Sequence, residues 1–244
     1  MKKSNTKKPN SKNRIIVALD TSDIRFAKKL VRSLKDSIKI FKVGSELFTA
    51  HGPKAVAVVR EAGAEVFLDL KYHDIPNTVA NAARAAAKMG VFMFNVHAAG
   101  GLQMMQEACM AAADEARKQS LTPPKLIAVT LLTSLNQEEV TKQIGISKSI
   151  DDIVIHYAEL AQKAGLDGVV ASAREIEKIR AKLGPQFLIV TPGIRPAWAE
   201  HGDQERVTTP KEALERGANY MVIGRPITEA EDPREAVFRI FAEL

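Results

Sequence analysis

The chain alternates short apolar runs with longer stretches in which apolar residues recur every three or four positions. A continuous apolar run is typical of a strand buried on both faces of a parallel sheet, whereas the wider spacing is typical of an amphipathic helix. The runs predict eight strands, at residues 15–19, 38–43, 64–68, 91–96, 125–131, 168–171, 187–190 and 220–223. The stretches between them predict helices, among them 24–35, 53–63, 79–89, 101–119, 151–164 and 174–183, and a last helix from about residue 233. In the first of these helices, Phe26, Leu30, Val31 and Leu34 are expected to form the apolar face.

Glycine recurs where a predicted helix leads into the next strand, at Gly63, Gly90, Gly165 and Gly217. Glycine suits the left-handed residue that ends a helix. The intervals differ, which indicates one structural unit used repeatedly rather than a solenoid repeat. Eight strand–helix units predict an α/β fold, a single-domain (βα)8 TIM barrel over residues 13–244. A doubly wound open sheet is the alternative, but no glycine-rich dinucleotide fingerprint follows the first strand.

Composition and charge narrow the class of protein. The 244 residues are 45% apolar and 26% charged, as in an ordinary globular protein, and the single cysteine, Cys109, excludes a disulfide framework. No apolar run approaches the roughly 20 residues that span a bilayer, and no apolar segment follows the first lysines as in a secretory signal. We therefore expect a cytoplasmic protein that does not associate with membranes.

The net charge of +6 is concentrated at the amino terminus. Residues 1–12 contain five lysines and no acidic residue, so the rest of the chain carries a net charge near +1. A polar tail of this composition is typical of disorder. We do not expect specific nucleic-acid binding, although a phosphate-ligand or RNA-binding module that uses the tail is an alternative.

Residues 69–78 concentrate chemistry at a predicted turn from strand to helix. Asp69 and Lys71, two apart on a strand, should point to the same side. Pro76 fits the first turn of a helix, and Asp74 precedes it, where free N–H groups favour a carboxylate. Burying two carboxylates and a lysine so close together in a core costs free energy, so this segment indicates a functional site.

Other predicted strands also end in polar or charged residues, namely Asp20, Lys42, His97, Thr133, Arg195 and Arg225. In (βα)8 barrels the carboxyl ends of the strands form the active face, so we expect these side chains to meet there. Interleaved carboxylates and lysines should keep the lysines protonated. No pair of histidines has metal-ligand spacing, so no metal is expected, and spacing assigns no role to His73 or His97.

The last two strand ends indicate a phosphate site. Gly193 and Gly224 allow the backbone to approach a ligand, and Arg195 and Arg225 follow them. Phosphate sites of barrels are often built from the loops after strands seven and eight. Residues 196–210 form a long stretch without evident structure, which we interpret as a flap over the phosphate.

Six segments together resemble the orotidine 5′-monophosphate decarboxylase family, in its bacterial branch: residues 17–20, 41–44, 69–78, 95–101, 191–195 and 222–228. The Asp-x-Lys-x-x-Asp core is shared with related sugar-phosphate enzymes, whereas the full 69–78 stretch together with residues 191–195 is more specific. The resemblance implies a lyase that converts orotidine 5′-monophosphate to UMP and CO₂ in de novo pyrimidine biosynthesis. It also implies that no cofactor is used and that the enzyme is a homodimer with shared active sites.

The resemblance further implies roles for individual residues. Lys71 would protonate C6 as CO₂ leaves, Asp69 would lie beside the substrate carboxylate, and Asp74 and Lys42 would complete the catalytic set. The implied substrate contacts are Asp20 and Lys42 at the ribose hydroxyls, Thr133 at the pyrimidine, Gln204 between base and phosphate, Arg195, Gly224 and Arg225 at the phosphate, and Asp74, Ile75 and Thr78 at the site of the other subunit.

The residues fit this chemistry, because loss of CO₂ from C6 leaves a carbanion without an adjacent carbonyl or cofactor to accept its charge. A preorganised lysine can stabilise that charge and then deliver a proton. Two other enzymes remain as alternatives: a Mg²⁺-dependent sugar-phosphate decarboxylase or aldolase of the same superfamily, and a Schiff-base aldolase using Lys42 or Lys71. Neighbouring carboxylates disfavour the latter because they raise the pKa of a lysine.

Overall fold

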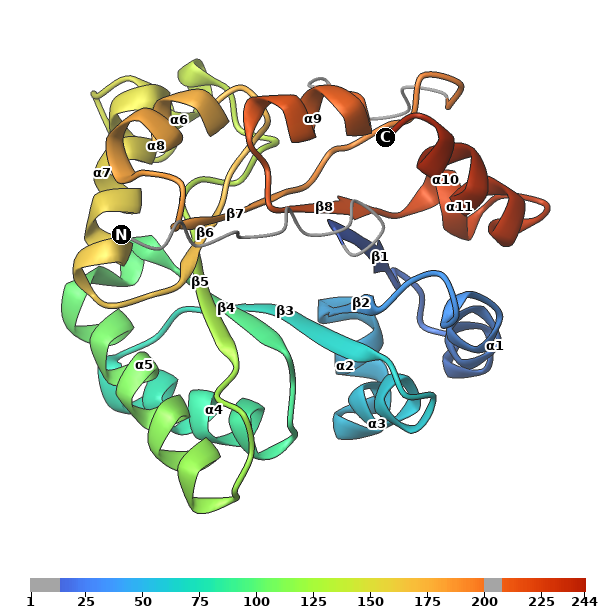
Figure 1. Cartoon of the computed structure of the whole chain (residues 1–244). Coiled ribbons are helices and arrows are strands. Elements are labelled where there is room, and N and C mark those ends of the chain that lie inside the picture. Colours follow the sequence, from blue (N-terminus) through green and yellow to red (C-terminus); the bar gives the residue numbers. More distant parts are fainter. Residues whose placement is uncertain (1–13, 200–207) are drawn as a thin grey trace, which may run out of the picture.

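A computed structural model describes residues 14–199 and 208–244, which form a closed barrel of eight parallel strands in chain order (Figure 1). The strands are β1 (Ile15–Ala18), β2 (Ile40–Gly44), β3 (Glu65–Tyr72), β4 (Met93–His97), β5 (Lys125–Val129), β6 (Gly168–Val170), β7 (Leu188–Thr191) and β8 (Tyr220–Ile223). The predicted single-domain (βα)8 barrel is confirmed. The prediction of a disordered tail at residues 1–12 lies outside the described residues.

Helices surround the barrel (Figure 1). They are α1 (Ile24–Leu34), α2 (Ser45–His51), α3 (Pro53–Glu61), α4 (Pro76–Lys88), α5 (Gly101–Lys118), α6 (Gln137–Lys142), α7 (Ile150–Lys163), α8 (Ile176–Leu183), α9 (Pro210–Arg216), α10 (Arg225–Thr228) and α11 (Pro233–Ala242), with the short 3-10 helix η2 (Ala98–Gly100). In the described part of the chain, none of these helices is long and apolar enough to cross a membrane.

The strands read as continuous apolar runs because each strand contributes to two cores. Alternate residues fill the inside of the barrel, where Ile16, Phe67 and Ile127 belong to one buried cluster. Their neighbours in the sequence, such as Val17 and Leu68, belong to the larger cluster between the barrel and the helices. Both faces of the sheet are therefore apolar, as in parallel sheets generally.

Helix boundaries follow local signals. Asp23 caps α1 by accepting a hydrogen bond from the backbone N–H of Arg25 at 2.8 Å. The buried stripe of α1 is Ala27, Leu30, Val31 and Leu34. The prediction that Phe26 belongs to this face is wrong: the residue is 40% exposed, because it lies one position off the stripe.

Four short helices, α2, α6, α9 and α10, were not predicted. Both α6 and α9 begin with a capping box, between Asn136 and Glu139 and between Thr209 and Glu212. Both pairs are present in the sequence, but neither was used to predict a helix. The predicted glycine helix ends at residues 63, 90, 165 and 217 are confirmed, since all four have positive φ. Most of the predicted flap at residues 196–210 lies outside the described residues.

Candidate active site

A cavity of about 320 Å³ opens at the carboxyl ends of the strands. Its lining includes most of the predicted site residues: Asp20, Lys42, Asp69, Lys71, Thr133, Gly193, Arg195, Gly224 and Arg225. They come from strands far apart in the sequence, because a closed parallel barrel brings all the carboxyl ends to one rim. Leu131, Leu132, Thr228 and Glu229 also line the cavity and were not predicted.

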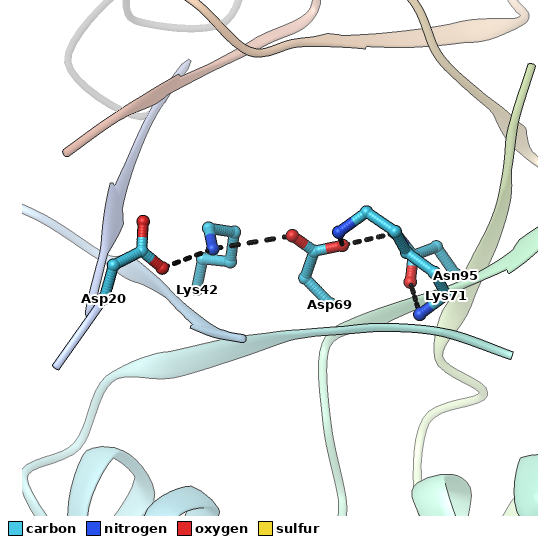
Figure 2. A network of polar contacts seen from close by, with 5 residues as sticks. All are labelled: Asp20, Lys42, Asp69, Lys71 and Asn95. Atoms are coloured by element: carbon cyan, nitrogen blue, oxygen red, sulfur yellow. Dashed lines mark hydrogen bonds and ion pairs between the residues drawn. The ribbon is translucent and has the colours of Figure 1, made fainter. Parts of the chain in front are cut away.

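Four charged side chains in the lining of this cavity form a line of alternating sign. Figure 2 shows this line, from Asp20 through Lys42 and Asp69 to Lys71. Lys42 Nζ lies 2.7 Å from Asp20 Oδ1 and 3.5 Å from Asp69 Oδ2. The other oxygen of Asp69, Oδ1, lies 2.8 Å from Lys71 Nζ. The carboxylate of Asp69 therefore bridges two ammonium groups.

Burial and neighbouring charges shift the pKa values of Asp69 and Lys42 in opposite directions. Burial alone would raise the pKa of Asp69, but Lys42 and Lys71 together with hydrogen bonds hold that pKa below its usual value. Burial alone would lower the pKa of Lys42, but Asp69 and Asp20 hold it above its usual value. Both groups are therefore ionised at neutral pH, as predicted for Lys42 from the sequence.

A β-bulge places Lys71. Between the pairs Leu68–Phe94 and Tyr72–Val96, β3 has three residues where β4 has only Asn95. Lys71 has φ of 51°, a left-handed conformation that costs a non-glycine residue about 1–3 kcal/mol. The prediction that Asp69 and Lys71 share one side is confirmed, since both line the cavity. Its reason, a regular strand, is wrong, because the strand is bulged at this point.

Asn95 joins these two residues and was not predicted to act at the site. Its side chain is fully buried; Nδ2 donates to Asp69 Oδ1 at 2.7 Å, and Oδ1 accepts from the backbone N–H of Lys71 at 2.8 Å (Figure 2). The signal in the sequence was a polar residue inside an apolar run. The matching segment 95–101 contains it, but no role was assigned.

The predicted phosphate end lies on the loops that follow β7 and β8, next to the Asp20 end of the line of charges, since a Cβ added at Gly224 would lie 3.8 Å from Asp20 Oδ2. Arg195 is only 6% exposed, and its backbone N–H donates to the carbonyl oxygen of Thr208 at 3.1 Å. Arg225 is exposed and begins the short helix α10 directly after Gly224. These residues supply cationic side chains on one wall of the cavity, as expected for an anion site.

Three predicted site residues do not line this cavity: Asp74, Ile75 and Thr78 are all exposed, and Ile75 is 66% exposed. Pro76 does begin α4, as predicted. Asp74 precedes this helix, as predicted, but it lies one position before the cap residue Ile75 and makes no side-chain cap hydrogen bond to the helix. The carboxylate of Asp74 instead accepts from the N–H of Ile75 at 2.6 Å.

His97 and His73 also lie outside the cavity lining, with ring centroids 5.6 Å apart. Burial lowers the pKa of His97, the charges of His73 and Lys71 lower it further, and Asp69 opposes them. Gln204, predicted to bridge base and phosphate, lies outside the described residues. Within residues 14–199 and 208–244, no group of three or more His, Cys, Asp or Glu side chains is placed to hold a metal ion.

Comparisons with known proteins agree with this geometry. A family model described as "Orotidine 5′-phosphate decarboxylase / HUMPS family" matches residues 13–240. The chain is 55% identical over 234 residues to orotidine 5′-phosphate decarboxylase of Moorella thermoacetica, which covers 96% of this chain and 93% of that protein. It is 52% identical over 233 residues to the enzyme of the same name from Nitrosococcus oceani, covering 96% and 98% of the two chains. The crystal structure of orotidine 5′-phosphate decarboxylase from Lactobacillus acidophilus matches with a TM-score of 0.83 at 38% identity, covering 95% of this chain and 98% of that one.

Proposed function

We propose that this chain, which belongs to the orotidine 5′-phosphate decarboxylase / HUMPS family, converts orotidine 5′-monophosphate to UMP and CO₂ in de novo pyrimidine biosynthesis. The observation that carries the proposal is the line of alternating charges from Asp20 to Lys71, which shares one cavity with Arg195 and Arg225. A nucleotide with an anionic phosphate at one end and a carboxylate at the other matches this distribution of charge.

The lining of the cavity supports an orientation for the substrate. Arg195, Arg225 and the backbone of Gly224 take the phosphate, and Thr133 faces the pyrimidine. The ribose hydroxyls lie at Asp20 and Lys42, which can accept and donate hydrogen bonds respectively. Gln204 is proposed to bridge base and phosphate. The substrate carboxylate then lies beside Asp69, with C6 near the ammonium of Lys71.

In the proposed step the bond between C6 and the carboxylate breaks, its electron pair stays on C6, and CO₂ leaves. The ammonium of Lys71 stabilises the developing negative charge because it is already in place before the reaction. The electron pair on C6 then takes a proton from Lys71, and the resulting neutral amine regains a proton from solvent. The sum is one substrate and one proton giving UMP and CO₂, with no cofactor.

Asp69 contributes by remaining charged. Because Lys42 and Lys71 lower the pKa of Asp69, its carboxylate is ionised when the substrate carboxylate arrives beside it. Two anions side by side raise the free energy of the bound substrate, and departure of CO₂ removes that repulsion. The binding energy of the distant phosphate can hold the substrate against this repulsion.

We further propose that the enzyme is a cytoplasmic homodimer with shared active sites. Asp74, Ile75 and Thr78 lie outside the cavity of their own chain, and all three are exposed. Their exposure supports a role at the site of a second subunit. Ile75 is 66% exposed, and a second subunit packed over it would bury this apolar side chain.

Loss of orotidine 5′-monophosphate absorbance in the presence of purified protein tests the proposed function. Lys71→Ala should lower turnover at least about 10³-fold, because it removes both the proton donor and the charge that stabilises the carbanion. Lys125→Ala is a matched control: the Lys125 side chain is 39% exposed, compared with 34% for Lys71, and is paired with one aspartate, Asp167, but it begins β5 at the opposite end of the barrel.

Turnover by Lys71→Ala near that of Lys125→Ala would refute the role of Lys71. A chelator added to the wild-type assay separates the alternatives. Unchanged turnover is expected for the proposed cofactor-free reaction, whereas loss of activity that Mg²⁺ restores would favour a metal-dependent enzyme of the same superfamily.

A further inference from the structure

We infer that Asn95 is a positioning residue for this reaction: without touching the substrate, its amide fixes the carboxylate of Asp69 and the backbone of Lys71 relative to each other. The inference rests on the proposed function and adds to it a residue that neither strand-end chemistry nor the cavity lining identifies. Asn95 is fully buried and does not line the cavity.

The bulge in β3 explains why a side chain is needed at this position. The three residues 69–71 face the single residue Asn95 on β4, so the regular ladder of hydrogen bonds between the strands is interrupted there. The side chain of Asn95 replaces part of that ladder by accepting the N–H of Lys71 at 2.8 Å. That hydrogen bond holds Lys71 at a φ of 51°, which a lysine does not adopt readily.

The chemistry of the two partners selects an amide. The backbone N–H of Lys71 can only donate, and the ionised carboxylate of Asp69 can only accept. One buried group must therefore accept from the first and donate to the second, while adding no charge beside Asp69. Asparagine meets these requirements, with contacts of 2.8 Å and 2.7 Å. Aspartate would lack the donor, and an apolar residue would lack both groups.

The amide also completes the set of groups around Asp69. That carboxylate faces Lys42 from β2, Lys71 from its own strand and Asn95 from β4, while Asp20 lies on the far side of Lys42 and His97 interacts electrostatically from β4. Of these groups, Asn95 is the neutral donor. Its hydrogen bond lowers the pKa of Asp69, so loss of the donor should raise that pKa.

Two substitutions separate the donor from the acceptor. Asn95→Ala removes both hydrogen bonds; we expect kcat to fall about 10–100-fold while KM changes less than about threefold, and the acidic limb of the pH profile to move to higher pH. Asn95→Asp keeps the shape and the contact to Lys71, but at neutral pH it places a second carboxylate against Asp69. As the pH falls, one proton shared by the two carboxylates restores the hydrogen bond, so this variant should regain activity relative to Asn95→Ala.

Asn219→Ala is the matched control. Asn219 precedes β8 at the opposite end of the barrel, where its Oδ1 accepts the backbone N–H of Ile189 at 2.8 Å. Both Asn219→Ala and Asn95→Ala should lower Tm, but Asn219→Ala should leave kcat and the pH profile unchanged. If Asn95→Ala fails to fold, the isosteric Asn95→Asp still reports on the donor through its pH profile.

The outcomes are distinguishable. If the wild type decarboxylates orotidine 5′-monophosphate and both Asn95 variants have its kcat and pH profile, the positioning role is overturned and the proposed function stands. Absence of orotidine 5′-monophosphate decarboxylation by the wild type and by Asn219→Ala would overturn both. A fall in kcat at constant KM, with the opposite pH responses of the two variants, would support the inference.

Discussion

Replacement of Lys42 by methionine tests whether the line of charges is a coupled unit. Lys42 has a side chain that is 11% exposed, and it lies between the carboxylates of Asp20 and Asp69 at 2.7 Å and 3.5 Å. Methionine has a similar length and fills the same space, so Lys42→Met removes the charge with little loss of contact area. The variant leaves Asp69 buried with Lys71 and Asn95 as its remaining partners.

The size of the effect follows from these distances. At an effective dielectric constant of about 20, the pair with Asp69 contributes about 5 kcal/mol of attraction, most of which offsets the desolvation of the two ions. The pair with Asp20 contributes much less, because the Asp20 side chain is 59% exposed and solvent screens its charge. Removing one partner of a buried pair costs about 3–5 kcal/mol, and the remaining partners of Asp69 place Lys42→Met at the lower end, near 3 kcal/mol. For a protein of this size, that loss lowers Tm by about 6–12 °C.

Thermal unfolding followed by circular dichroism measures this change. Lys142→Met is the control: Lys142 lies 2.8 Å from Glu138, but both side chains are more than 70% exposed, so the expected loss is below about 0.5 kcal/mol. Adding Asp69→Asn to Lys42→Met removes the unpaired buried charge and should restore part of the stability. Equal Tm values for Lys42→Met and Lys142→Met, or no recovery in the double variant, would show that the charges are not coupled.

Two further predictions address the phosphate and the pH dependence. Arg225→Ala should lower kcat/KM for orotidine 5′-monophosphate about 10–100-fold, because a charge-assisted hydrogen bond to the phosphate is lost. The same measurement is made with orotidine, which lacks the phosphate. If the substitution lowered kcat/KM equally for both substrates, the phosphate role of Arg225 would be contradicted. Because the folded pKa of Asp69 is lowered, its ionised form contributes stability that is complete above the unfolded value of about 3.9 and is lost as the pH falls through the folded value. Wild-type stability should therefore fall more steeply than that of Asp69→Asn as the pH falls below about 4 in denaturant titrations, and parallel curves would contradict this.

The barrel and most of its charged rim were predictable because they depend on local signals and one topological rule. Apolar runs such as residues 15–18 identify strands, and parallel closure brings the residue after each strand to the same rim. Asp20, Lys42 and Asp69 could therefore be expected to meet although they come from three strands. Their alternation of sign along the rim follows from the chain order of those strands.

The bulge and its support were not predictable, because they depend on the register between two strands. The sequence around Lys71 contains no glycine that would indicate a left-handed residue, and Asn95 lies 24 positions away. Only the pairing of β3 with β4 shows that Asn95 faces three residues. The exposure of Asp74, Ile75 and Thr78 was likewise invisible, because they follow a strand end as the cavity residues do.

The two lysines of the line have different surroundings, and the difference favours Lys71 as the proton donor. Lys42 is held by two carboxylates that raise its pKa, so its proton is held more tightly than in a free lysine. Lys71 contacts one carboxylate oxygen, at 2.8 Å, and its side chain is 34% exposed compared with 11% for Lys42. In the proposed mechanism, solvent can therefore return a proton to Lys71 after each turnover, whereas Lys42 is enclosed. The proposed roles follow from position: Lys42 keeps Asp69 ionised, and Asp69 in turn would hold the ammonium of Lys71 where the proposed carbanion forms.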